Sequence, residues 1–275
     1  MAIESSFVET PYGRFHFEAT GAGKPVLFIH GGTASAREWR PVLEALGEHA
    51  HCVAIDRLGC GESDRSARGY DRATLTNSLL ACADALGFDR FGVVGQSFGG
   101  FWALCLAFAA PQRISRMVLV NSAGGPMTDA ELAERRARMA ARRQAAGATS
   151  EAEREAAIER TMTTIFADPH RVPASFRDDL RWQMEHADPA QVGIVDGEHE
   201  RLAHEPYDRL TIPTLVVWGE ADAMIPGDRG RRLAAAIPGA RYAGLPGVGH
   251  TCQIEAPRAF VAAVAPFLDE TAAIA

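Results

Sequence analysis

Several features that mark common classes of protein are absent from this sequence of 275 residues. No apolar run approaches the ~18 residues that a membrane span needs. The N-terminus lacks the basic and apolar segments of a secretion signal. Acidic residues outnumber basic ones, 35 to 28, and no basic stretch stands apart from acidic neighbours. We therefore expect a soluble, cytoplasmic protein that binds neither nucleic acid nor a membrane.

Cysteine is also scarce. The five cysteines are an odd number, are scattered along the chain, and include no C-x-x-C pair. This pattern argues against a disulfide framework and against a structural zinc site, and it suits a reducing compartment. We expect no metal centre.

Short apolar runs alternate with longer helical patterns along most of the chain. The runs are rich in Val, Leu and Ile and nearly continuous, which is typical of parallel strands buried on both faces. They cover residues 25–30, 51–56, 91–96, 116–121 and 214–219, with a weaker run at 240–245. Residues 7–21 predict an antiparallel hairpin that turns at Pro11–Gly13. The sequence thus predicts an α/β protein with a mostly parallel central sheet of about eight strands flanked by helices.

The alternation stops between residues 126 and 205, where Ala, Arg and Glu dominate. Two capping boxes, Thr128 with Glu131 and Ser150 with Glu153, predict helix starts. We interpret 126–205 as a helical cap inserted after the sixth strand, and 1–125 with 206–275 as the core domain.

A serine stands between glycines in "GVVGQSFGGFW". The stretch G-Q-S-F-G at 95–99 matches G-x-S-x-G and lies between a predicted strand and an apolar helix. A serine at so sharp a turn takes a strained positive φ, and the flanking Gly95 and Gly99 let strand and helix approach closely. The hydroxyl of Ser97 is then exposed, and the N–H of Phe98 points forward at a helix N-terminus, where an oxyanion is stabilised. The competing interpretation of Ser97 as an ordinary N-cap does not explain both glycines.

A serine nucleophile needs a base, and the base needs a carboxylate. Among nine histidines, His250 is the one in a Gly-rich loop, "LPGVGHTCQ", after the last predicted strand. Asp222 directly follows the strand 214–219 and is the predicted acid. Glu220 and Asp228 are neighbouring alternatives, although Asp228 also fits the N-cap of the next helix.

The order Ser97, Asp222, His250, together with "HGG" at 30–32, "DRLGCGESD" at 56–64 and "GHTCQIEAPRAF" at 249–260, resembles the α/β-hydrolase superfamily over essentially the whole chain. The resemblance implies a cap-bearing serine hydrolase whose second oxyanion donor is the N–H of Gly32, with Thr33 the near alternative. It implies no cofactor.

The predicted reaction is hydrolysis of a carboxylic ester of a small to medium, largely apolar substrate, in the carboxylesterase class EC 3.1.1. The residues expected to line the substrate pocket are Thr33 and the apolar Phe101, Phe166, Phe176, Trp182 and Met184. Some of these apolar residues serve only to dock the cap. One alternative is a carbon–carbon hydrolase of vinylogous diketones, whose relatives carry Asn and Trp where this chain has Gln96 and Thr251. The other is a non-catalytic ligand receptor. The sequence leaves the natural substrate open, and equally whether the chain is a monomer or a homodimer.

Overall fold

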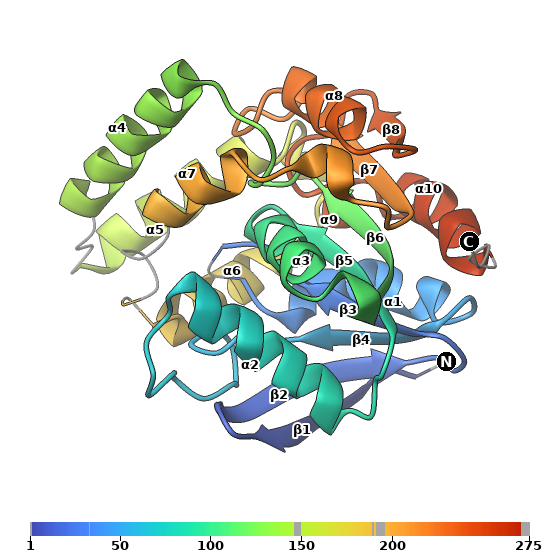
Figure 1. Cartoon of the computed structure of the whole chain (residues 1–275). Helices are drawn as coiled ribbons and strands as arrows, with labels where there is room; N and C mark the ends of the chain where they lie inside the picture. Colours follow the sequence, from blue (N-terminus) through green and yellow to red (C-terminus); the bar gives the residue numbers. More distant parts are fainter. Residues whose placement is uncertain (1, 33, 146–149, 189, 191–195, 271–275) are drawn as a thin grey trace.

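The computed structural model describes residues 2–270 except 33, 146–149, 189 and 191–195. Its centre is an eight-stranded sheet in the order β1-β2-β4-β3-β5-β6-β7-β8 (Figure 1). The strands are β1 (Glu4–Thr10), β2 (Gly13–Thr20), β3 (Pro25–Ile29), β4 (His51–Ile55), β5 (Phe91–Gln96), β6 (Ile114–Val120), β7 (Thr214–Gly219) and β8 (Arg241–Leu245). The β1–β2 and β2–β4 pairs are antiparallel, and all other neighbours are parallel. The predicted hairpin and the mostly parallel sheet are both confirmed.

The strand residues alternate between two apolar cores. On β3, Leu27 and Ile29 belong to one core, whereas Val26 and Phe28 belong to the other. Successive side chains of a strand point to opposite faces, so continuous apolar runs imply helices on both sides of the sheet. Outside residues 126–205, the α-helices of the described residues are α1 (Arg40–Leu46), α2 (Arg72–Ala85), α3 (Phe98–Ala109), α8 (Gly227–Ala236), α9 (Cys252–Glu255) and α10 (Pro257–Asp269).

The two faces of the sheet are covered by different helices (Figure 1). Apolar residues of α2, α3 and α8 join the first core, whereas those of α1 and α10 join the second. The carboxyl ends of the parallel strands therefore form one edge between two helical layers, where ligands usually bind in such sheets.

Helix starts follow the capping rules in most of the predicted places. Both capping boxes are present: the Thr128 hydroxyl accepts from the N–H of Glu131, and the Ser150 hydroxyl from that of Glu153. The prediction that Asp228 is an N-cap is wrong, because α8 already begins at Gly227. Asp228 therefore lies in the first turn, where its carboxylate still favours the positive end of the helix.

Four α-helices of the described residues lie between β6 and β7, and we call residues 126–205 the helical segment. They are α4 (Asp129–Ala145), α5 (Glu151–Ile165), α6 (Phe176–His186) and α7 (Asp196–Ala203). In space, α4 packs against α7 and α5 against α6. A small apolar cluster of α5 and α6 includes Ile254 of α9, so the segment is docked on the rest of the chain.

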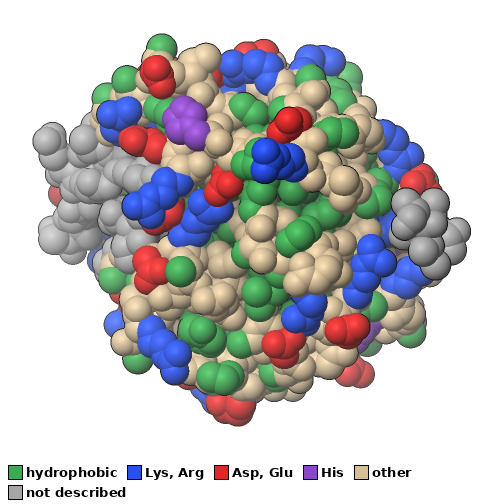
Figure 2. Space-filling view, viewed as in Figure 1, with side chains coloured by type: hydrophobic (Ala, Val, Ile, Leu, Met, Phe, Trp, Pro, Cys, Tyr) green, Lys and Arg blue, Asp and Glu red, His purple; other side chains and the backbone are tan. Residues whose placement is uncertain are grey.

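The surface mixes charges of both signs. In Figure 2, Lys and Arg side chains alternate with Asp and Glu around the visible face, and apolar side chains gather toward its centre. Within the part of the chain that is described, no helix is both long enough and apolar enough to cross a bilayer.

Candidate active site

Ser97 occupies a strained turn between β5 and α3. Its φ is 50° and its ψ is −113°, a conformation that non-glycine residues rarely adopt. The side chain makes no capping hydrogen bond to the helix. A Cβ atom on Gly95 would lie 2.3 Å from the carbonyl oxygen of Gly99, and one on Gly99 would lie 1.9 Å from that of Ile29. The turn therefore closes this tightly only because both flanking residues are glycine.

Asp222 and His250 form a buried pair at the carboxyl ends of β7 and β8. The Nδ1 atom of His250 donates a 2.7 Å hydrogen bond to Oδ2 of Asp222. The other carboxylate oxygen accepts from the N–H groups of Met224 and Ile225, at 2.7 and 2.9 Å. A proton on Nδ1 leaves Nε2 of the neutral imidazole as an acceptor, which is the form that a general base requires.

The alternative acids lie elsewhere. Glu220 forms an ion pair with Arg231, and Asp228 forms one with Arg232. Sequence order alone left these carboxylates open, whereas the turn after β7 brings Asp222 to the imidazole.

Asn121, at the end of β6, is a member of this cluster that the sequence analysis missed. Its Nδ2 donates to Oδ2 of Asp222 at 2.7 Å, and its Oδ1 accepts from the N–H of Gly219 at 3.0 Å. The Sγ of Cys252 also donates to that oxygen, at 2.9 Å. Asn121 has φ 41°, a region that asparagine tolerates better than most residues. The one signal in the sequence was its position directly after a predicted strand.

The base-bearing loop is joined both to the turn and to the helical segment. Gln96, which precedes the serine, donates from Nε2 to the carbonyl of His250 at 3.0 Å. The N–H of His250 donates to the carbonyl of Ile165, at the end of α5, at 2.7 Å. Buried Glu255 accepts from the N–H groups of Gly249, Ala167 and Asp168, at 2.8 to 3.2 Å.

The predicted oxyanion loop lies beside the serine. A Cβ atom on Gly31 would be 2.3 Å from Oε1 of Gln96 and 3.5 Å from Cβ of Ser97, whereas one on Gly32 would meet nothing within 4 Å. Phe98 is the first residue of α3, so its N–H has no acceptor within the helix. Thr33, the alternative donor, lies outside the described residues.

Two buried titratable groups flank this loop. Burial lowers the pKa of His30 to about 3, and the nearby Arg57 guanidinium acts in the same direction. Burial raises the pKa of Glu38 to about 8, against the opposing effects of the Gly31 N–H and of Arg57. At neutral pH the imidazole is therefore uncharged and the carboxyl largely protonated. The contacts of His30 with the Gly31 carbonyl and the Arg57 N–H make it a structural residue of this loop.

The residues predicted to line the pocket occupy three different places. Phe101 is fully buried on α3, with its ring 5.2 Å from that of Phe98. Phe166 and Phe176 lie together, 5.3 Å apart, in the α5–α6 cluster with Ile254. Trp182 packs under the Arg37 guanidinium, and Met184 is 38% exposed.

One aromatic contact joins the helical segment to the turn. His199 of α7, fully buried, stacks on Phe101 at 4.4 Å and on Phe98 at 5.8 Å. Because Phe98 directly follows Ser97 in the chain, α7 packs close to the turn that holds this serine. His199 is therefore a packing residue at this contact.

The described residues contain no group of three or more His, Cys, Asp or Glu side chains arranged to hold a metal ion. Cys252, the thiol nearest the acid–base pair, is fully buried, and burial raises its pKa. Its contacts make it a packing residue with a weak hydrogen bond.

The model of the alpha/beta hydrolase fold family matches residues 24–257. The chain belongs to this family. A relative is the dihydrolipoyllysine-residue acetyltransferase component of the acetoin cleaving system of Pseudomonas putida, 30% identical over 252 residues. The match covers 87% of this chain but 62% of that protein, so this chain spans less than two thirds of its length.

Two other matches cover nearly the whole of both chains. The 2-hydroxymuconate semialdehyde hydrolase of a Pseudomonas species is 31% identical over 285 residues, which covers 95% of this chain and 93% of that protein. A hydrolase from Pseudomonas aeruginosa of known structure is 28% identical, with a TM-score of 0.78, and the match covers 97% of this chain and 99% of that one. The predicted resemblance is thus confirmed at the level of the family, which is one of hydrolases.

Proposed function

We propose that this protein is a serine hydrolase that cleaves a carboxylic ester of a small to medium, largely apolar substrate. The observation that carries the proposal is the strained Ser97 at a glycine-flanked turn, joined through Gln96 to the loop of a buried His250–Asp222 pair. A fold that only needed a helix start here would not hold a serine at positive φ.

The reaction would proceed through an acyl-enzyme. Ser97 Oγ attacks the carbonyl carbon while its proton passes to Nε2 of His250, and the N–H groups of Gly32 and Phe98 stabilise the oxyanion. The bond to the alcohol then breaks, and His250 returns the proton to the leaving oxygen. Water, deprotonated by His250, attacks the acyl carbon and releases Ser97.

In this proposal residues 126–205 form a cap over the site. Support comes from the hydrogen bond of His250 to Ile165 and from the stacking of His199 on Phe98. One half of the segment thus contacts the loop of the base and the other contacts the residue after the nucleophile, and a substrate beneath the segment would be shielded from water.

A second candidate is hydrolysis of a carbon–carbon bond in a vinylogous diketone. It is supported by the match over nearly the full length of a protein named 2-hydroxymuconate semialdehyde hydrolase. The same nucleophile and base would serve, with a carbon leaving group taking the proton. Against it, Gln96 and Thr251 replace the Asn and Trp that the sequence analysis associates with such enzymes.

The test compares wild type with Ser97→Ala on p-nitrophenyl esters from acetate to dodecanoate and on a vinylogous diketone. We expect ester turnover to fall by about 10³-fold or more in the variant, whereas Ser6→Ala, an exposed serine of β1, leaves it unchanged. Diketone turnover that exceeds ester turnover would favour the carbon–carbon hydrolase. A stoichiometric burst without turnover would favour a ligand receptor, and equal rates in wild type and Ser97→Ala would refute both hydrolases.

A further inference from the structure

Both backbone polar groups of Gly31 are held by buried side chains. Its N–H donates to Oε1 of Glu38 at 3.0 Å. Its carbonyl accepts from Nδ1 of His30 at 2.8 Å and from Nη2 of Arg57 at 3.0 Å. The same Nη2 atom of Arg57 also donates to the carbonyl of Gly32. Two consecutive carbonyls of the oxyanion loop therefore converge on one guanidinium nitrogen.

This arrangement fixes the direction of the Gly32 N–H. In a trans peptide the carbonyl of one residue and the N–H of the next point in opposite directions. Because the Gly31 carbonyl is drawn toward Arg57, the N–H of Gly32 is turned away from it. A glycine has the freest backbone of all residues, so two successive glycines would not keep this orientation without such contacts.

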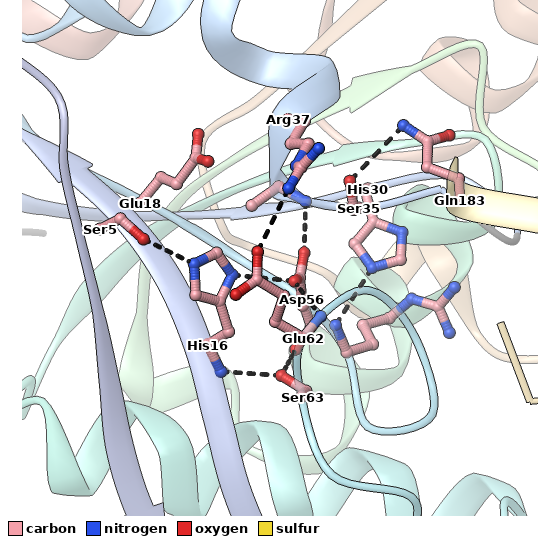
Figure 3. A network of polar contacts seen from close by, with 12 residues as sticks. Ser5, His16, Glu18, His30, Ser35, Arg37, Asp56, Glu62, Ser63 and Gln183 are labelled. Carbon is pink, nitrogen blue, oxygen red and sulfur yellow. Dashed lines mark hydrogen bonds and ion pairs between the residues drawn. The ribbon is translucent and has the colours of Figure 1, made fainter. Parts of the chain in front are cut away.

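Arg57 is itself rigidly placed. It is 1% exposed, and its N–H donates to Nε2 of His30 at 3.1 Å. The preceding Asp56 accepts from the imidazole of His16 and from the N–H of Ala36, at 2.8 and 2.6 Å (Figure 3). The loop that carries Arg57 is thus tied to β2 and to the residues that follow the oxyanion loop.

The guanidinium also lies close to the other wall of the site. Its central carbon is 5.2 Å from the centre of the Phe98 ring. A positive charge near the site stabilises negative charge more strongly in a buried environment than in water. A hydrogen bond from a charged donor also polarises the peptide that accepts it, which strengthens the N–H on the far side of that peptide.

We propose that Arg57 is a positioning residue of the oxyanion hole, which orients the Gly32 N–H by holding the carbonyls of Gly31 and Gly32. This inference rests on the proposed function, because it assigns Arg57 to the stabilisation of a tetrahedral intermediate on Ser97. Arg57 does not touch substrate. It acts through the loop.

The chain offers a matched control in Arg116. That side chain is also buried and also donates to two backbone carbonyls, those of Phe267 and Glu270. It lies near the start of β6, five residues before Asn121, which places it ~16 Å along the strand from the catalytic edge. Loss of Arg116 therefore reproduces the structural cost of removing a buried arginine without touching the site.

The experiment uses the purified full chain and the variants Arg57→Met, Arg57→Lys and Arg116→Met. We measure kcat and KM on the best p-nitrophenyl ester, the melting temperature, and inhibition by a trifluoromethyl ketone. This inhibitor forms a tetrahedral adduct with an active serine. Arg57→Met should lower kcat by about 10- to 100-fold with little change in KM, and weaken the inhibitor by a similar factor. Arg57→Lys should recover part of the lost kcat and part of the lost inhibitor affinity. Arg116→Met should lower the melting temperature but not kcat.

Unchanged kcat and inhibitor affinity in a folded Arg57→Met would overturn the proposal, as would equal losses in the two methionine variants. If Arg57→Met does not fold, Arg57→Lys decides. The lysine side chain reaches less far than that of arginine and lacks its rigid planar fork, so it should not hold the two carbonyls as Arg57 does. Wild-type kcat and inhibitor affinity in Arg57→Lys would therefore also overturn the proposal. Failure of the proposed function has a different signature, because wild type itself would then neither turn over esters nor bind the inhibitor.

Discussion

The side-chain amide of Asn121 donates to the same Asp222 oxygen, Oδ2, that accepts the hydrogen bond of His250, and both distances are 2.7 Å. One carboxylate oxygen thus accepts hydrogen bonds from the imidazole and from a residue at the end of the neighbouring strand β6. The acid is held by β6 as well as by its own loop, so the pair is a feature of the sheet and not of β7 alone.

Removal of the Asn121 amide should therefore misplace the acid. Asn121→Ala removes a donor to Asp222 and the acceptor of the Gly219 N–H. We expect kcat to fall by about tenfold or more, with KM little changed. Asn77→Ala, at an exposed position of α2, is the control. Equal kcat values for the two variants would contradict the role of Asn121.

The glycines of the active-site region should differ sharply in their tolerance of alanine. A Cβ atom on Gly99 would lie 1.9 Å from the Ile29 carbonyl oxygen, whereas one on Gly32 meets nothing within 4 Å. Gly99→Ala should lower the free energy of unfolding by roughly 3 kcal/mol or more, because backbone must move. Gly32→Ala should leave it within about 1 kcal/mol of wild type. Urea titration measures the free energy of unfolding of both variants. A loss in Gly99→Ala as small as that in Gly32→Ala would show that the turn tolerates a side chain.

Glu38 should make stability depend on pH. Its pKa is about 8 in the folded chain and 4.5 ordinarily. As pH rises between these values, the unfolded chain releases the proton while the folded chain keeps it, so the free energy of unfolding falls. Glu38→Gln cannot ionise and should gain stability relative to wild type from pH 5 to pH 8. Glu44→Gln, at an exposed position of α1, should follow wild type. The melting temperature of each protein, measured from pH 5 to pH 8, checks this prediction. The same pH dependence in all three proteins would mean that Glu38 has an ordinary pKa.

Glu255 should be required for the docking of the helical segment. Its carboxylate accepts from three N–H groups, two of the segment and one beside His250. Glu255→Ala leaves these donors without an acceptor, so we expect the free energy of unfolding to fall by about 2 to 3 kcal/mol. Faster proteolysis within 126–205 should accompany this loss. Glu255→Gln keeps one acceptor and should lose less. A segment as resistant in Glu255→Ala as in wild type would argue against this role.

The main parts of the fold were predictable because their signals are local. Continuous apolar runs give buried strands, and Gly95 and Gly99 around a serine give the turn. Roles that depend on which strands are neighbours were not predictable. Asn121 acts only because β6 pairs with β7, and Arg57 only because β4 lies beside β3.

The aromatic residues of the helical segment show the same limit. Phe166 and Phe176 were expected either to line the substrate pocket or to dock the cap, and both lie in the cluster with Ile254. An apolar residue in a polar helix signals burial against a partner, but composition does not say which partner. His199, by contrast, reaches Phe98 without any distinctive sequence context.

The hydrogen bond from the His250 N–H to the Ile165 carbonyl has a consequence for how the protein responds to heat. The backbone of the base and the end of α5 are one hydrogen-bonded unit, so α5 cannot lift away without moving the imidazole. Partial opening of a protein costs less than its complete unfolding. Activity should therefore vanish, reversibly, several degrees below the main melting transition, at the temperature where α5 detaches.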